Sequence, residues 1–184
     1  MNGAMNVTTN NSVELVMTVP EPHGTLHDYH ARCRTTLGVL AQLLAQAKRR
    51  VIIGALFIQS SQELADGVVA DAVQSALRRG VCVEFLSTGP SLLAVERDRL
   101  LQETSGNLQL FQPSANLINE HKLGSHAKFC VADGKSAYIG SANLTGPGLS
   151  GQLELGVLVH GEIARQIEQF WDYAVENGLY VCVT

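Results

Sequence analysis

The chain contains 184 residues, 46% of them apolar, which is enough for an ordinary globular domain with a hydrophobic core. The formal net charge of −4 excludes the bulk positive field that many nucleic-acid-binding proteins carry, so a polyanionic partner would be held by a local patch. The apolar runs are too short to span a bilayer, and the polar N-terminus lacks the pattern of an export signal. We therefore expect a cytoplasmic protein without membrane contact.

The first half of the chain predicts a strand-helix-strand unit. Residues 1–30 are expected to form an N-terminal extension or an edge element, and a helix with one apolar side follows. Residues 51–58 are apolar on both faces and predict a buried strand. A capping-box pattern at Ser60 and Glu63 opens the next helix, and residues 81–86 form the next strand. This order implies a right-handed crossover between parallel strands.

The second half continues with a helix near 91–104, a short strand near 108–112, a loop at 113–124 and a final helix. The loop is long enough to face a substrate. One side of the final helix is apolar and should pack on the core: Ile163, Ile167, Phe170, Trp171 and Ala174. Together these elements predict one α/β domain over residues 1–184, with a mixed, largely parallel sheet flanked by helices on both faces.

Two basic runs, Lys48-Arg49-Arg50 and Arg78-Arg79, could suggest nucleic-acid binding. Both lie where predicted helices end, and cations there complement the helix dipole. Both also precede predicted strands, which places them at the amino edge of a parallel sheet, whereas ligands usually bind at the carboxyl edge. We therefore expect the substrate elsewhere.

Four cysteines are scattered through the chain without any C-x-x-C spacing. Cys82 and Cys130 lie within apolar segments and are expected to be small buried thiols. The cysteines therefore predict neither a disulfide nor a zinc site.

The most informative stretch is residues 126–143, which reads HAKFCVADGKSAYIGSAN. Asp133-Gly134 is a favoured two-residue hairpin turn between two apolar segments. If Ala132 pairs with Lys135, the register brings His126 opposite Ser141.

Strand alternation then places His126 and Lys128 on one face, and Asn143 lies just beyond the returning strand. An imidazole, an ammonium, a hydroxyl and an amide therefore converge. Such a set suits a phosphate, because Lys128, Ser141 and Asn143 can donate to its oxygens while His126 attacks phosphorus.

This pattern resembles the HKD motif of the phospholipase D superfamily, and each defining position is matched: His126, Lys128, Asp133, Gly140, Ser141 and Asn143. A further match is Glu154, where superfamily members carry a carboxylate that orients the histidine. The resemblance covers residues 35 to 177 and implies the phospholipase D-like α/β/α sandwich. Shorter stretches, including SANLTGPGLS, resemble the phospholipase D-like component of bacterial DISARM-type anti-phage systems.

The resemblance implies a role for each matched residue. His126 would form a phosphohistidine that water then hydrolyses, and Lys128, Ser141 and Asn143 would hold the phosphate oxygens. Glu154 would hydrogen-bond the imidazole and fix its tautomer. The family chemistry uses no metal and no cofactor.

Two matched positions, Asp133 and Gly140, are expected to serve the structure of the motif, since the turn places Asp133 far from His126. The mechanism requires a second histidine as general acid, and this chain has one motif. The resemblance therefore implies a homodimer through the HKD face.

Three functions remain open. The first is a nuclease in anti-phage defence, acting on DNA more than on RNA, with possible partners in a defence complex. The second is a lipid phosphodiesterase, which the lack of an amphipathic membrane element disfavours. The third is a non-catalytic dimeric module that binds nucleic acid or partner proteins.

Overall fold

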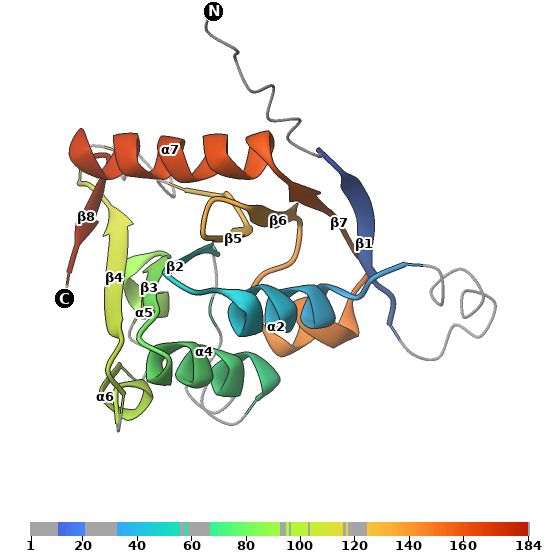
Figure 1. The fold of residues 1–184 in the computed structure, drawn as a ribbon, viewed down its shortest axis with the longest axis horizontal. Helices are drawn as coiled ribbons and strands as arrows, with labels where there is room; N and C mark the ends of the chain where they lie inside the picture. The colour runs from blue at the N-terminus through green and yellow to red at the C-terminus, as the bar shows by residue number, and fades with distance from the viewer. Residues whose placement is uncertain are drawn as a thin grey trace, which may run out of the picture.

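The computed structural model describes residues 11–20, 33–55, 58, 67–92, 95, 97–102, 104–115, 117 and 125–183. They form one eight-stranded sheet in the order β1-β7-β6-β5-β2-β3-β4-β8 (Figure 1). The strands are β1 (Val13–Thr18), β2 (Arg50–Gly54), β3 (Cys82–Leu86), β4 (Asn107–Pro113), β5 (Phe129–Ala132), β6 (Ser136–Gly140), β7 (Glu154–His160) and β8 (Tyr180–Cys182). The helices are α2 (Thr36–Gln46), α4 (Val68–Arg78), α5 (Gly89–Leu92), α6 (Arg97–Leu100), the π-helical turn η2 (Pro147–Gly151) and α7 (Glu162–Glu176).

The sheet is mixed, as predicted. The pairs β2–β3 and β3–β4 are parallel, and the other five pairs are antiparallel. The parallel part is thus smaller than expected, because β5, β6 and β7 follow one another as neighbouring antiparallel strands and β1 and β8 pair antiparallel at the two edges.

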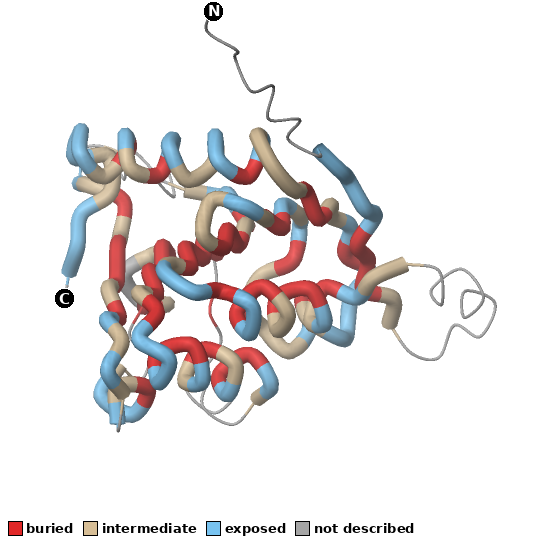
Figure 2. The backbone as a smooth tube through the Cα atoms, viewed as in Figure 1, coloured by how far each residue is buried: buried red, intermediate tan, exposed pale blue. Residues whose placement is uncertain are grey.

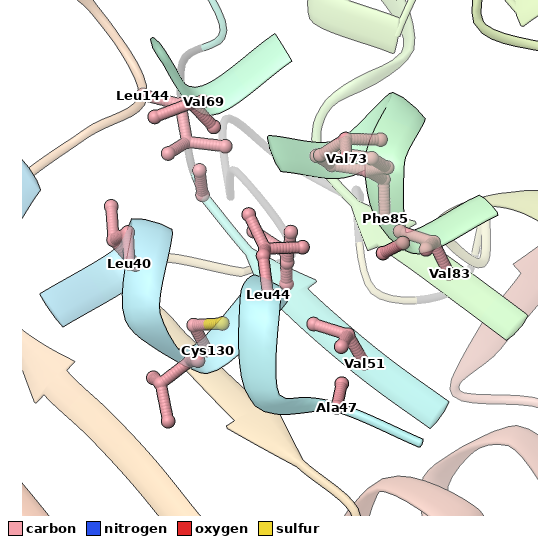
Figure 3. Packing of buried hydrophobic residues seen from close by; sticks show 14 of the residues in the cluster. Leu40, Leu44, Ala47, Val51, Val69, Val73, Val83, Phe85, Cys130 and Leu144 are labelled. Carbon is pink, nitrogen blue, oxygen red and sulfur yellow. The ribbon is translucent and has the colours of Figure 1, made fainter. Parts of the chain in front are cut away.

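Helices cover both faces of the sheet, which confirms the predicted sandwich. On one face α2 and α4 pack over the central strands and bury the larger apolar cluster, including Leu44, Val73 and Phe85 (Figure 3). On the other face α7 buries a smaller cluster around Trp171 (Figure 1). No helix in the described segments is long and apolar enough to cross a membrane.

Several predicted boundaries change. The strand expected at 51–58 ends at Gly54, and Ile58 makes only an isolated bridge to Leu144. The helix expected near 91–104 is two short helices, α5 and α6. The strand near 108–112 is confirmed as β4. The capping box at Ser60 and Glu63 and most of the 113–124 loop lie outside the described residues.

The final helix is only partly as expected. Trp171 and Ala174 are buried, and the Trp171 ring meets Phe111 edge-on with ring centroids 5.1 Å apart. Ile163 and Phe170, however, are 42% and 59% exposed, so their prediction as core residues is wrong. The apolar stripe of α7 is wider than the part of the sheet that it covers, and its edge faces solvent (Figure 2).

A partly buried ionic network anchors α7 to the amino edge of the sheet. Arg50, the first residue of β2, binds Glu84 of β3 through two contacts of 2.6 and 2.8 Å, and its third nitrogen binds Asp172 at 2.6 Å. The Trp171 indole donates to the same Glu84 carboxylate at 2.5 Å. Burial alone would lower the pKa of Arg50, but both carboxylates outweigh it and raise the pKa, so the guanidinium stays charged.

Candidate functional site

The hairpin that carries the motif folds as a tight turn, with a shifted register. Asp133 and Gly134 adopt φ values of 55° and 62°, and the Lys135 amide donates to the Ala132 carbonyl at 3.0 Å, as expected of a type I′ turn. The ladder, however, pairs Ala132 with Ser136. Lys135 is extra to the ladder because its carbonyl accepts the Gly161 amide at 2.9 Å instead.

This one-residue shift changes what faces the start of β5. The Gly140 amide donates to the Lys128 carbonyl at 3.1 Å, so Lys128 lies opposite Gly140. The predicted pairing of His126 with Ser141 is therefore wrong by one residue. The hairpin still returns the Ser141 end of β6 to the His126 end of β5, at the carboxyl edge of β2 and β3.

His126 and Lys128 form the first half of the site. His126 is exposed, whereas Lys128 is 8% exposed and turns its ammonium back toward the imidazole. The Lys128 Nζ lies 3.2 Å from His126 Nδ1 and donates to the His126 carbonyl at 3.1 Å. The Lys128 ammonium thus lies next to Nδ1 of the imidazole, and the rest of the His126 ring is exposed to solvent.

Ser141 and Glu154 form the second half. The Ser141 hydroxyl donates to the Glu154 carboxylate and accepts the Leu155 amide at 3.1 Å, and the Ser141 amide donates to the Leu155 carbonyl at 3.0 Å. Glu154 is 9% exposed at the first position of β7. The contact shown for its carboxylate is with Ser141. The His126 imidazole, expected as its partner, has its Nδ1 against Lys128 instead.

The two halves of the site interact electrostatically. Burial lowers the pKa of Lys128, and the negative charge of Glu154 opposes that shift and favours the ammonium. A buried cation next to a buried carboxylate and two exposed polar groups is a cradle for an anion that arrives from solvent. Asn143 lies half-buried in the turn that follows Ser141.

Asp133 lies at the opposite edge of the sheet from His126. Its carboxylate accepts the backbone amides of Lys48, Arg49 and Arg50 at 2.9, 2.9 and 3.0 Å. Burial alone would raise its pKa, but these amides outweigh burial and lower the pKa, so the side chain clamps the start of β2 as an anion. The basic run at 48–50 therefore sits at the amino edge, as predicted, with its backbone engaged in structure.

An apolar groove of about 460 Å³ adjoins the site. It runs from His126 along the end of β6 to α7, and its apolar walls include Ile139, Ile163, Ile167 and Phe170. Sequence reasoning missed this groove, because the helical period of α7 marks its apolar side without telling core from open surface.

The arrangement can bind and attack a phosphate. It provides one imidazole nucleophile, one cation and hydroxyl and amide groups that can approach phosphate oxygens. Within the described ranges, no three His, Cys, Asp or Glu side chains cluster as ligands for a metal ion.

Sequence comparisons identify a matching family and a curated relative. The model of the family described as "Cardiolipin synthase, PLD-like domain" matches residues 40–174. A curated relative, the DISARM protein DrmC of Bacillus paralicheniformis, is 26% identical over 177 residues, which is 92% of this chain. The chain spans 65% of that relative's length.

Solved structures share the fold at low sequence identity. Nuc from Salmonella typhimurium, a phospholipase D family member, is 16% identical with a TM-score of 0.59, and the match covers 88% of this chain and 92% of Nuc. NucT from Helicobacter pylori is 16% identical with a TM-score of 0.59, over 94% and 97% of the two chains. Phosphatidylserine synthase from Haemophilus influenzae is 12% identical with a TM-score of 0.65, over 100% of this chain and 42% of the synthase. At these identities the likeness concerns the fold.

Proposed function

The chain belongs to the phospholipase D-like family, and on that premise we propose that it is a metal-independent phosphodiesterase that cleaves nucleic acid through a phosphohistidine intermediate. The observation that carries the proposal is the juxtaposition of the open His126 ring with the buried ammonium of Lys128, 3.2 Å away. A phosphodiester entering from solvent meets a nucleophile and a cation at the same point.

The chemistry proceeds in two displacements. A His126 ring nitrogen attacks phosphorus, the P–O bond to the leaving group breaks, and the leaving oxygen takes a proton from a general acid. Water then attacks the phosphohistidine, the P–N bond breaks, and the imidazole is regenerated. Lys128 neutralises the phosphate oxygens throughout, and Ser141 and Asn143 donate to them, while Glu154 balances the charge of the ammonium.

The general acid comes from a second copy of the chain, so the active species is a homodimer that faces itself through the HKD face. His126 of the partner subunit protonates the leaving oxygen. One imidazole is a nucleophile and the other an acid, and a single motif cannot supply both at once.

An uncovered apolar surface supports this dimer. Leu15 and Ile139 both lie opposite Val157 in neighbouring ladders, and Val157 packs in the cluster under α7. They therefore point to the same face as α7 but lie beyond its cover, and both are exposed. With Leu155 and the α7 side chains Ile163 and Phe170 they make up the apolar face, which adjoins the groove at His126.

Three of the compared proteins support a nucleic-acid substrate and a role in anti-phage defence. The relative DrmC is a DISARM protein, and Nuc and NucT share the fold over nearly their whole length. We propose DNA as the preferred substrate over RNA, in the cytoplasm, and proteins of a defence complex as possible partners. The net charge of −4 implies that the phosphate backbone is held at the site itself and not by the general field of the protein.

The decisive experiment is a cleavage assay in EDTA with labelled single- and double-stranded DNA and RNA. Wild type should cut and His126→Ala should not, while His160→Ala, a histidine at the far edge, should cut like wild type. Stopping the reaction in alkali should reveal a covalent phosphoryl adduct that His126→Ala lacks. Cleavage by His126→Ala, or cleavage that requires a divalent cation, would contradict the proposal.

One observation favours a second candidate, a lipid phosphodiesterase. The 460 Å³ groove beside His126 has largely apolar walls and could accept an acyl chain. Release of headgroup from phospholipid vesicles by wild type but not by His126→Ala, without nucleic-acid cleavage, would select this function. A folded dimer that binds nucleic acid equally well with and without the His126 imidazole, and turns over neither substrate, would select the non-catalytic module.

A further inference from the structure

Tyr138 lies under the site in a slot made by two glycines. It is 2% exposed in the middle of β6, on the face of the sheet covered by α2. Gly140 and Gly156 face each other across β6 and β7, and a Cβ added at either would overlap the tyrosine ring. Neither glycine has a positive φ, so what each provides is space. The glycine of the motif therefore lets the ring extend along the sheet toward Ser141.

The Tyr138 hydroxyl lies near buried polar groups beneath the site. Its surroundings are the Thr36 hydroxyl, the Ala142 backbone and the charge of Glu154. Burial raises the pKa of Tyr138 and Glu154 raises it further, against the opposing effects of Thr36 and Ala142, so the phenol remains an O–H donor. Neither the Tyr138 hydroxyl nor that of Thr36 reaches hydrogen-bond geometry with another described residue.

A third buried hydroxyl belongs to the same region. Thr18 pairs with Glu154 in the β1–β7 ladder, is 5% exposed, and its hydroxyl also has no hydrogen-bond partner among the described residues. A buried hydroxyl without a partner loses its hydrogen bonds to water, so such groups in folded proteins normally bind one another, a water or a charged neighbour. Glu154 is a buried carboxylate of this region and accepts such donors well.

We propose that Tyr138 is a positioning residue, whose buried O–H holds the Glu154 carboxylate and the Ser141–Ala142 backbone from beneath through one bound water. Glu154 already binds Ser141 from the side and balances Lys128. The phenol supplies a donor from below, which keeps the carboxylate in place while a phosphate binds above it. The inference rests on the proposed function of the site.

The test compares Tyr138→Phe with wild type, because phenylalanine fills the glycine slot and removes only the O–H. Orthophosphate affinity, measured by calorimetry, should fall about tenfold, the loss expected for one hydrogen bond to a charged group. Cleavage should slow mainly through kcat, with an altered pH profile. Tyr180→Phe, which alters a tyrosine stacked on Trp171, should leave both unchanged.

A second readout needs no substrate. The carboxyl signal of Glu154 in ¹³C-glutamate-labelled protein, assigned through Glu154→Gln, should shift in Tyr138→Phe and not in Tyr180→Phe. An unchanged carboxyl signal in folded Tyr138→Phe would overturn the positioning role, whatever the activity. If wild type neither binds orthophosphate nor cleaves, the proposed function fails, and the carboxyl signal alone decides whether Tyr138 positions Glu154.

Discussion

The Lys128 ammonium lies 3.2 Å from Nδ1 of His126, although Lys128 itself is only 8% exposed. A cation in that position is costly for folding, because burial disfavours its charged form and lowers its pKa. Proteins keep such groups where function needs them. We therefore expect that replacing Lys128 lowers activity without lowering stability.

We predict that Lys128→Met strongly reduces cleavage without lowering the free energy of unfolding. Cleavage should fall by about 10²–10³, as for the loss of a donor that stabilises developing charge. The unfolding free energy at neutral pH should be equal or higher, because methionine fills the space without a buried charge. Activity and chemical denaturation of the same preparation check both statements, and a marked loss of stability would contradict the assignment.

The pH dependence of stability follows from the same shift. The pKa of Lys128 is lower in the folded than in the unfolded chain, so the unfolded state binds more protons between the two values. Stability attributable to Lys128 should therefore rise as the pH increases toward its unfolded pKa of about 10.4. This rise should be missing from Lys128→Met, as measured by urea denaturation at a series of alkaline pH values.

Glu154→Gln should uncouple the two halves of the site. The amide still approaches Ser141, but the charge that favours the Lys128 ammonium is gone. We expect cleavage to fall on the order of 10². The Lys128 amine should also react faster with an acylating reagent at neutral pH, since more of it is uncharged, and peptide mapping can measure this. Equal reactivity in both proteins would count against the coupling.

The hairpin that carries the motif could be predicted from sequence because its residues lie close together in the chain. The spacing from His126 to Asn143 and the Asp133-Gly134 turn are local features, and local geometry returns one end of the hairpin to the other. The register was missed by one residue because it depends on a distant partner, the Gly161 amide that takes the Lys135 carbonyl. The slot that holds Tyr138 was missed because Gly140 and Gly156 come from different strands.

The exposure of individual apolar side chains was the other feature that could not be predicted from the sequence. Phe170 and Trp171 are adjacent in an apolar stripe, yet one is 59% and the other 1% exposed. A side chain that packs on its own core and one that packs on another subunit follow the same helical period. The apolar residues wrongly predicted to be core are thus part of the surface that supports the proposed dimer.

Asp133→Ala should destabilise the fold and leave the chemistry in place. It removes the acceptor for three backbone amides at the start of β2, and we expect a loss of about 2 kcal/mol in unfolding free energy. The pKa of Asp133 is depressed in the folded state, so its contribution is present above the unfolded pKa and is lost as the pH falls below about 4. Wild type and variant should therefore converge in stability at acid pH, and residual folded variant should still cleave.

Phe170→Glu should disrupt the proposed dimer without unfolding the monomer. The side chain is 59% exposed in the isolated chain, so a charge there costs little until a partner covers it. We expect the variant to sediment as a monomer and to lose activity at concentrations where wild type is dimeric. Tyr173→Glu, another exposed position on α7 that does not line the groove, is the matched control and should remain dimeric.

Mixing subunits tests whether two chains share one site. If both imidazoles are needed, a dimer of wild type with His126→Ala is inactive, so only wild-type pairs cleave. After exchange with a ninefold excess of His126→Ala, about one wild-type chain in ten has a wild-type partner, and activity should fall about tenfold. Independent sites would keep full activity. The double variant His126→Ala with Phe170→Glu, which should not dimerise, must fail to inhibit, because inhibition by it would mean competition for substrate and not shared sites.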